Sequence, residues 1–253
     1  MKRIVQGQNK KCKFGCIYCF TKENYYTNGQ HELSEEELQD VDIIQPFSDY
    51  DVFACENSDW QNEIEYYSHY NRIISFATKA HITKNIAKEL SNINSCLKLK
   101  GAFLHVGISI STIKHIKDLE PRSSSFESRI ESLKILQENN IPCSVIIRPV
   151  LPTLDNDELE NIVKSTYQYC DNYIYGPLYL NTDIENYLKN KGYVLEKKLH
   201  SVKWREGTPT CYIHESEQQY EAIKDCCKKY GKNAYPSNNL AVDSIKVALL
   251  KNQ

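Results

Sequence analysis

The sequence lacks the features that would define a membrane-spanning, disordered or nucleic-acid-coating protein. Purely apolar runs are short, such as Val145–Ile147, whereas a membrane-spanning helix needs about 20 apolar residues. Lysine and arginine (31) nearly balance aspartate and glutamate (33), which excludes a polycationic, histone-like protein. There is no internal repeat or low-complexity segment, and 41% hydrophobic residues suffice to bury a core. What remains is a globular protein, and 253 residues favour one domain.

The sequence contains ten cysteines. The first residues, MKRIVQGQNKKCKFG, are basic but contain no apolar stretch, so we expect no signal peptide. We therefore expect a reducing, cytoplasmic location and no membrane partner. In such a compartment cysteines serve metal binding, catalysis or burial more often than disulfides. Three of the ten lie close together, at Cys12, Cys16 and Cys19.

Strand and helix patterns alternate along the chain. Short apolar, β-branched or aromatic runs predict strands at Asp51–Cys55, Arg72–Thr78, Ala102–Ile110, Pro142–Val150 and Asn172–Tyr175, with another near Arg3–Gln6 or Asn233–Tyr235. A capping box at Ser34 and Glu37 predicts a helix that continues through the stretch ELQDVDII, and a cap at Asn156 predicts the start of another. Amphipathic spacing predicts further helices over Trp60–Tyr70, Thr83–Leu90, Ser124–Asn139 and Gln219–Tyr230.

Repeated β–α units imply an α/β fold with a mainly parallel sheet and helices outside it. The number of strands fits an open or partial barrel better than a complete eight-fold one, and functional groups should lie at the carboxyl ends of the strands. We expect one domain over residues 1–253, with the core barrel in residues 1–175. Residues 176–253 are less regular and are expected to supply a lid and a small C-terminal helical extension.

The segment Cys12-Lys-Phe-Gly-Cys16-Ile-Tyr-Cys19 is the most informative part of the sequence. Three thiolates at this spacing can point into one loop, and Gly15 lets that loop turn tightly. Three protein ligands leave one corner of a cubane cluster open, whereas a structural zinc site normally closes with a fourth ligand. Zinc knuckles usually show paired CxxC motifs, and no second pair lies nearby. Tyr18 can cover a cluster or an adenine ring with its aromatic face.

The CxxxCxxC spacing, with an aromatic residue before the last cysteine, resembles the radical S-adenosylmethionine (SAM) superfamily. The resemblance implies a [4Fe–4S] cluster on Cys12, Cys16 and Cys19, whose unique iron chelates the amino and carboxylate groups of SAM. It also implies a reductant such as flavodoxin or ferredoxin, cleavage of SAM to a 5′-deoxyadenosyl radical, and hydrogen abstraction from a substrate. The implied fold is a partial (β/α)6 barrel, which agrees with the strand count from periodicity.

A narrower resemblance, to the spore photoproduct lyase and photolyase-like branch, covers about residues 10–165. The segments that carry it are Phe53-Ala-Cys-Glu-Asn-Ser-Asp59, Ile74-Ser-Phe-Ala-Thr-Lys79, Ile108-Ser-Ile-Ser111, the Glu120-Pro block that ends in Arg129-Ile-Glu131, and Ile147-Arg-Pro-Val-Leu-Pro152. Two of them depart from the branch pattern. The spacing from the cysteine to Ser-Asp in the first is one residue longer than in the lyase, and Ser132 replaces an alanine after the Glu120 block.

The resemblance implies roles for several polar residues. Lys79 ends an apolar strand, an unusual place for a charge, and would pair with the methionyl carboxylate of SAM. Ser58 would contact the methionyl part, or else cap the following helix. Ser109 would hydrogen-bond the ribose or the carboxylate, or else lie buried in its strand. Arg129 would fix the preceding loop through Glu120 rather than contact a ligand.

Cys55 is the residue with the most specific implied chemistry. In the lyase a cysteine of this segment donates a hydrogen atom to the product radical, because an S–H bond is weaker than most C–H bonds. We expect Cys55 to end a strand on the catalytic face, where it could act in this way. The alternative is a small buried hydrophobic residue, which is the usual state of a free cysteine.

The substrate is less defined than the chemistry. Repair of a thymine lesion in DNA is the best-known activity of the branch, and residues 186–253 hold 12 Lys and Arg against 7 Asp and Glu, which favours an anionic partner. Surface lysines without a partner would give the same count. Modification of RNA, a peptide or a small molecule is an alternative within the family. An iron–sulfur electron carrier or a zinc-binding module is the alternative from other classes.

Overall fold

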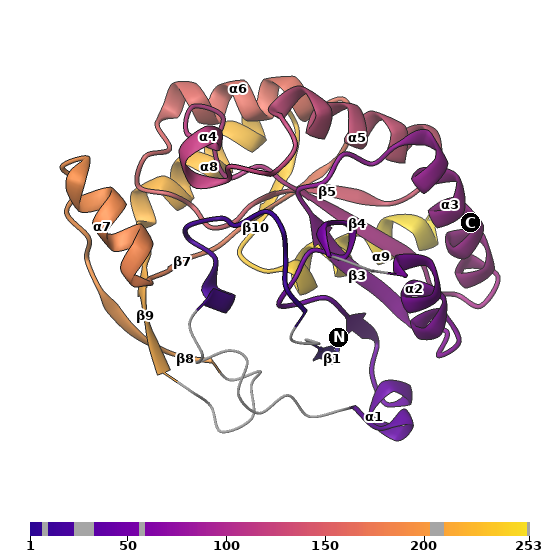
Figure 1. Cartoon of the computed structure of the whole chain (residues 1–253). Helices are drawn as coiled ribbons and strands as arrows, with labels where there is room; N and C mark the ends of the chain where they lie inside the picture. The colour runs from indigo at the N-terminus through magenta and orange to yellow at the C-terminus, as the bar shows by residue number, and fades with distance from the viewer. Residues whose placement is uncertain (7–9, 23–32, 56–58, 203–209, 252–253) are drawn as a thin grey trace.

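The computed structural model describes residues 1–6, 10–22, 33–55, 59–202 and 210–251. Within these ranges seven strands form one parallel sheet that curls into a half-barrel, in the order β1-β2-β3-β4-β5-β6-β10 (Figure 1). The strands are β1 (Arg3–Val5), β2 (Ile43–Gln45), β3 (Ile73–Thr78), β4 (Leu104–Ser109), β5 (Cys143–Ile147), β6 (Asn172–Tyr175) and β10 (Asn233–Tyr235). The expected α/β fold, a partial barrel, is therefore confirmed.

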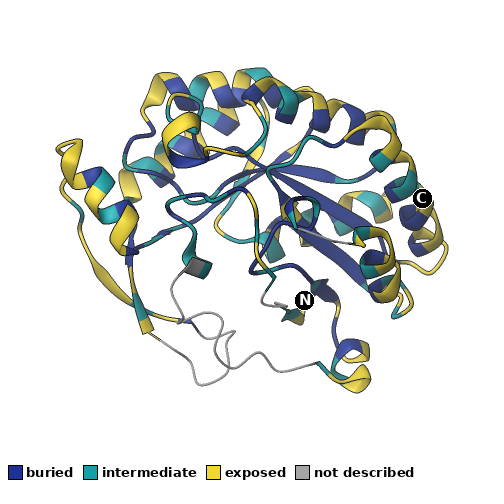
Figure 2. Cartoon of the chain, viewed as in Figure 1, coloured by how far each residue is buried: buried dark blue, intermediate teal, exposed yellow. Residues whose placement is uncertain are grey.

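Helices cover the outside of the curled sheet, with their apolar faces turned inward (Figure 2). The described helices are α1 (Glu35–Gln39), α2 (Trp60–Ser68), α3 (Lys84–Lys98), α4 (Ile116–Leu119), α5 (Phe126–Glu138), α6 (Asn156–Thr166), α7 (Thr182–Asn190), α8 (Glu217–Lys229) and α9 (Asn238–Lys251), of which α7 lies beside the small antiparallel sheet instead. Ser34, Asp59, Thr83 and Ser125 each accept a backbone N–H at the start of the next helix, and the capping box predicted at Ser34 and Glu37 is present. None of the described helices is long and apolar enough to cross a membrane.

Three local predictions are wrong. The predicted strand Asp51–Cys55 is a single 3-10 turn, Val52–Ala54, because the Asp51 carboxylate accepts the Phe53 N–H and caps the turn. The second strand is instead β2, within a stretch that we predicted as helix. Helix α1 stops at Gln39, and a strand of three residues is too short to show a two-residue period. The cap of α6 is Asp155, one residue before the predicted Asn156.

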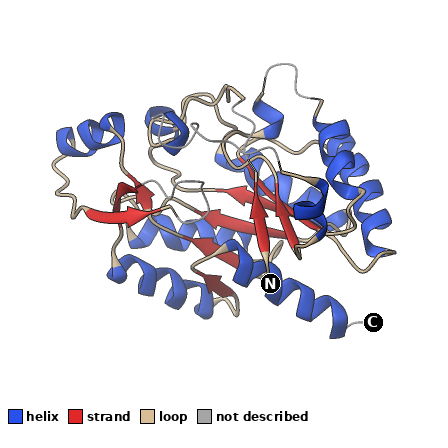
Figure 3. Ribbon diagram, turned by 90° about the horizontal axis from the view of Figure 1, so that it is seen from below, coloured by secondary structure: helices blue, strands red, loops and turns tan. Residues whose placement is uncertain are grey.

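The segment after residue 175 is more regular than the sequence suggests. It contains α7 and a small antiparallel sheet in the order β7-β9-β8, formed by Leu178–Tyr179, Thr210–His214 and Lys198–Ser201 (Figure 3). It also supplies β10, which pairs with β6 at the end of the large sheet. Both candidate positions for a further strand, near Arg3–Gln6 and at Asn233–Tyr235, are therefore occupied.

Helix α9 lies across the amino-terminal ends of the strands. Its Val242 and Ile245 pack against Ile43 and Ile73, which begin β2 and β3, and against Phe103 before β4. Apolar burial at this end leaves the carboxyl ends of the strands as the open side of the barrel. The candidate site is therefore expected at the end opposite α9.

Candidate functional site

The cysteine loop is fixed by backbone contacts to three other parts of the chain. Gly15 has a positive φ of 66°, the tight turn that the sequence predicts. The Lys13 N–H donates to Ala54 over 2.8 Å, and the Ile17 N–H donates to Leu119 over 3.0 Å. Asn181, from the segment after β6, donates its side-chain amide to the carbonyls of Ile17 and Cys19.

A cavity of about 340 Å³ lies at the open side of the barrel, a size typical of small-molecule sites. Cys12, Cys16, Cys19, Tyr18, Lys79 and Ser109 all line it. Alternate residues of a strand point to the same face, so Ser75, Ala77 and the following Lys79 project from β3 into the barrel interior. The structure therefore brings the three predicted cluster ligands and three of the four predicted SAM-binding residues to one cavity.

Lys79 contacts three of its neighbours at the end of β3. Its ammonium donates to the Ser109 hydroxyl over 2.7 Å and lies 5.6 Å from the centre of the Tyr18 ring. Its backbone N–H donates to the Asp51 carboxylate over 2.7 Å, and Thr78 donates to the same carboxylate. These contacts place a point charge beside the cysteine loop, at the edge of the cavity.

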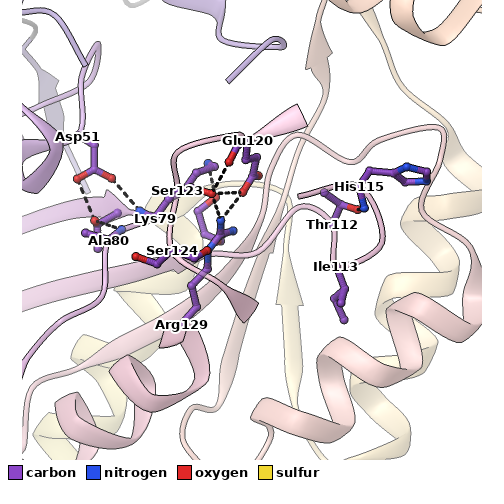
Figure 4. A network of polar contacts seen from close by, with 12 residues as sticks. Asp51, Lys79, Ala80, Thr112, Ile113, His115, Glu120, Ser123, Ser124 and Arg129 are labelled. Carbon is purple, nitrogen blue, oxygen red and sulfur yellow. Dashed lines mark hydrogen bonds and ion pairs between the residues drawn. The ribbon is translucent and has the colours of Figure 1, made fainter. Parts of the chain in front are cut away.

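A buried polar network lies behind Lys79 (Figure 4). Glu120 and Arg129 are fully buried; they form an ion pair, and Glu120 also accepts the Tyr18 hydroxyl. Arg129 donates further to the Ser109 carbonyl over 2.9 Å and to the Ser124 carbonyl over 3.0 Å. The network thus joins the cysteine loop, the end of β4 and the loop before α5. Arg129 contacts Glu120 as expected, and it also holds the backbone at Ser109 and Ser124 directly.

The protonation states within the network follow from burial and charge. Burial raises the pKa of Glu120, but the Lys79 ammonium and the Arg129 guanidinium outweigh that effect and hold its pKa below the ordinary value. Burial and the nearby Glu120 raise the pKa of Tyr18 well above its ordinary value. Glu120 is therefore ionised at neutral pH, and Tyr18 remains a neutral phenol that donates to it.

Asp51 is a site residue that the sequence analysis missed, because it was assigned to a strand. Burial raises the pKa of its carboxyl group, while the N–H groups of Lys79 and Phe53 and the Thr78 hydroxyl oppose the shift. Asp49, also buried, lines the same cavity. The pattern Asp49-Tyr-Asp51 ahead of a helix was the available signal for two acidic residues at the cavity.

The floor of the barrel is polar and connects to α9. His105 on β4 is fully buried; its Nδ1 lies 2.8 Å from the Ser75 hydroxyl and its Nε2 lies 2.9 Å from the Ser144 hydroxyl. Burial lowers the pKa of His105 to about 4, so the imidazole is neutral at physiological pH. Asn238, the first residue of α9, donates to Ser75 over 2.9 Å. His105 is therefore a hydrogen-bonded structural residue.

The donor set at the cysteine loop fits an iron–sulfur cluster. Soft thiolates select iron–sulfur clusters among metal centres, and here three thiols line one cavity beside the cationic Lys79. Burial raises the pKa of Cys12, and raises that of Cys16 to about 12 although the Lys79 ammonium opposes the shift. In the described residues no three metal-binding side chains converge as a single metal ion would require. A cubane does not need such convergence, because its three thiolates bind three different irons.

For two of the predicted site residues, Cys55 and Ser58, the structure gives no contact with the cavity to report. Cys55 pairs with Cys12 through an isolated antiparallel bridge, and its thiol points to the Lys11 carbonyl at 3.5 Å. It is not among the residues that line the described part of the cavity, so its role as a hydrogen donor stays a prediction. Ser58 lies outside the described residues, and its contact with SAM also stays a prediction.

Similar solved structures share the fold. Spore photoproduct lyase complexed with dinucleoside spore photoproduct has a TM-score of 0.59 at 11% identity, over 92% of this chain and 81% of that chain. SuiB of Streptococcus suis bound to S-adenosylmethionine has a TM-score of 0.53 at 12% identity, over 75% of this chain and 48% of that chain. The radical SAM methyltransferase TsrM of Kitasatospora setae, with tryptophan and a SAM analogue bound, has a TM-score of 0.55 at 11% identity, over 90% of this chain and 51% of that chain.

Sequence comparison reaches closer relatives. An uncharacterized protein of Methanocaldococcus jannaschii is 28% identical over 200 residues, which cover 72% of this chain and 73% of that protein. A family model described as the radical SAM superfamily matches residues 9–166, more than half of the chain. That match spans the cysteine loop, the strands that carry Lys79 and Ser109, and the helix that carries Arg129. The match over residues 9–166 shows that this protein belongs to the radical SAM superfamily.

Proposed function

We propose that the protein holds a [4Fe–4S] cluster on Cys12, Cys16 and Cys19 and cleaves SAM reductively to abstract hydrogen from a substrate in the same cavity. The observation that carries this proposal is the convergence of the three thiols with the contacting pair Lys79 and Ser109 on one cavity. Reduced by flavodoxin or ferredoxin, the cluster would supply the electron that breaks the sulfur–carbon bond of SAM.

The chain's own residues bind and orient SAM. Lys79 presents its ammonium to the methionyl carboxylate, and the Ser109 hydroxyl, which now accepts from Lys79, is free to donate to that carboxylate or to the ribose. The ring of Tyr18 is fixed between Lys79 and Glu120 and forms one wall of the cavity. A fixed, enclosed site favours the intended hydrogen abstraction, because a radical reacts with whichever bond is held nearest.

We propose a nucleic-acid substrate, with a UV lesion in DNA as the first candidate. Two observations support it: the excess of basic residues in 186–253, and the shared fold with a lyase whose solved complex contains a dinucleoside photoproduct. Modification of RNA, a peptide or a small molecule is the alternative. Its support is that TsrM, a methyltransferase whose solved structure contains a tryptophan substrate, shares the same fold.

The cluster assignment predicts the effect of removing one thiol. Cys16→Ala should lose the iron–sulfur absorbance and form no 5′-deoxyadenosine, since two thiolates cannot hold the cubane. The matched control is Cys96→Ala, because Cys96 is an exposed cysteine on α3. Iron content, visible absorbance and 5′-deoxyadenosine by mass spectrometry are measured after anaerobic reconstitution and reduction. Full iron content in Cys16→Ala would contradict the assignment.

The Lys79 assignment predicts weaker SAM binding. Lys79→Met removes the ammonium while keeping much of the apolar stem, so the Kd for SAM should rise about tenfold, or about 1.4 kcal/mol. Lys84→Met, at the exposed start of α3, should leave the Kd unchanged. Isothermal titration of SAM into the reconstituted variants measures both constants. Equal affinity in the two variants would remove Lys79 from the SAM site.

The buried network predicts a large loss of stability. Glu120→Gln leaves the Arg129 charge buried without its carboxylate, which should lower the free energy of unfolding by about 3–5 kcal/mol. Denaturant titration should show that Glu120→Gln combined with Arg129→Met recovers much of this loss. Glu221→Gln, in the exposed pair with Lys224, should change nothing measurable.

The same pair has a defined pH dependence. Because the folded-state pKa of Glu120 lies below its ordinary value of 4.5, its contribution is complete at neutral pH and disappears as the pH falls through that lowered pKa. The stability difference between wild type and Glu120→Gln should therefore shrink in acid. A difference that stays constant down to the lowest pH measured would contradict an ionised Glu120.

The substrate proposal predicts stimulation by damaged DNA. With reductant and SAM present, UV-irradiated thymine-containing DNA should increase 5′-deoxyadenosine formation over the same DNA without irradiation, and repaired thymines should appear. The comparison is made by mass spectrometry of both products. Equal yields with irradiated and intact DNA would leave SAM cleavage in place and transfer the search to RNA, peptides and small molecules.

A further inference from the structure

Two arginines that the SAM assignment does not use line the same cavity. Arg3 begins β1, and Arg148 directly follows β5. These strands are separated by β2, β3 and β4 in the sheet, so only the curling of the sheet brings them to face one cavity. Burial lowers the pKa of Arg3, and the nearby guanidinium of Arg148 lowers it further.

Within the described residues neither guanidinium forms an ion pair with a carboxylate. Arg3 donates to the Gln45 side-chain oxygen over a long distance of 3.4 Å. The buried carboxylate Asp51 is committed to Lys79, Thr78 and Phe53. Two like charges facing one cavity are stabilised when an anion binds between them.

The Arg148 side chain packs against the backbone at Gly176, where there is no side chain in its way. A Cβ on Gly176 would lie 2.9 Å from Nε and 3.0 Å from Cδ of Arg148, so a side chain there would displace the guanidinium. The Gly176 carbonyl accepts the Val150 N–H over 3.0 Å, which fixes this stretch against the end of β5. The absence of a side chain at Gly176 is therefore what makes this position of the Arg148 guanidinium possible.

Aromatic side chains lie on the same side of the cavity. Phe20 and Tyr179 both line it, with ring centres 5.7 Å apart, and Tyr179 is close enough to Arg3 to affect its pKa. Aromatic faces stack on nucleobases, while arginine forks match the oxygens of a phosphate. The combination fits a ligand that carries both groups.

We propose that Arg3 and Arg148 form a phosphate-binding subsite for a nucleotide unit of the substrate, separate from the SAM site at Lys79. This inference rests on the proposed function, because it names the substrate group that the same cavity recognises. Arg148 binds the phosphate through its fork, Gly176 allows the position of that fork, and Arg3 adds the second charge. SAM carries no phosphate, so its own binding does not require the subsite.

The test compares thymidine 5′-monophosphate with thymidine, by isothermal titration into the reconstituted full-length protein with SAM present. The monophosphate should bind at least tenfold more tightly, and Arg148→Gln and Arg3→Gln should each remove most of that preference. Gly176→Ala keeps both charges but should weaken binding of the monophosphate, because the added methyl group displaces the Arg148 guanidinium. Arg72→Gln, an arginine outside the cavity, should bind as wild type does.

Several outcomes would overturn the proposal. Equal binding of thymidine and its monophosphate by wild type would remove the phosphate preference. Acetate competing as well as inorganic phosphate would indicate a carboxylate subsite. A rise in the Kd for SAM in Arg148→Gln, with the phosphate preference intact, would assign the arginines to SAM. If Arg148→Gln does not fold, Arg148→Lys takes its place in the test, because it keeps the charge but loses the planar guanidinium that binds two phosphate oxygens.

The result is independent of the proposed chemistry. Phosphate preference is an equilibrium measurement that needs no reductant and no turnover. Wild-type protein that prefers the monophosphate but forms no 5′-deoxyadenosine would refute the radical mechanism and leave the subsite in place. Protein that forms 5′-deoxyadenosine without any phosphate preference would refute the subsite alone.

Discussion

The rest of the site depends on the buried ion pair between Glu120 and Arg129. Arg129 holds the end of β4 through the Ser109 carbonyl, and Glu120 holds the cysteine loop through the Tyr18 hydroxyl. A buried ion pair adds little net stability over apolar packing, but it is costly to break, so its partners have few alternative positions. The pair therefore fixes where Lys79, which lies on Tyr18 and contacts Ser109, presents its charge.

The curled parallel sheet brings the residues of the site together around one cavity. Carboxyl ends of parallel strands meet at one edge, so residues that follow β3, β4 and β5 converge although long helices separate them in sequence. Helix α9 covers the opposite end, and Asn181 ties the segment after β6 to the cysteine loop. Three separate parts of the chain thus surround the cavity that the cysteine loop, Lys79 and Ser109 line.

Much of this could be predicted from the sequence, because the signals are local. The capping box at Ser34 and Glu37 marked the start of a helix, and runs such as Ala102–Ile110 were long enough to show as strands. The cysteine spacing and the strand-end position of Lys79 indicated the site. The error at Asp51–Cys55 has a physical cause: an apolar, aromatic run predicts a strand, but the preceding carboxylate caps a turn.

The sequence by itself determined the local elements, the thiol-bearing loop with its turn at Gly15, and the chemistry that three closely spaced cysteines can hold. Only the tertiary structure decided which distant charges share a cavity. Arg3 and Arg148 lie far apart in the chain, and their approach depends on how strongly the sheet curls. Periodicity reports which face of an element is buried, whereas the distance between two elements is set by the packing of all the others.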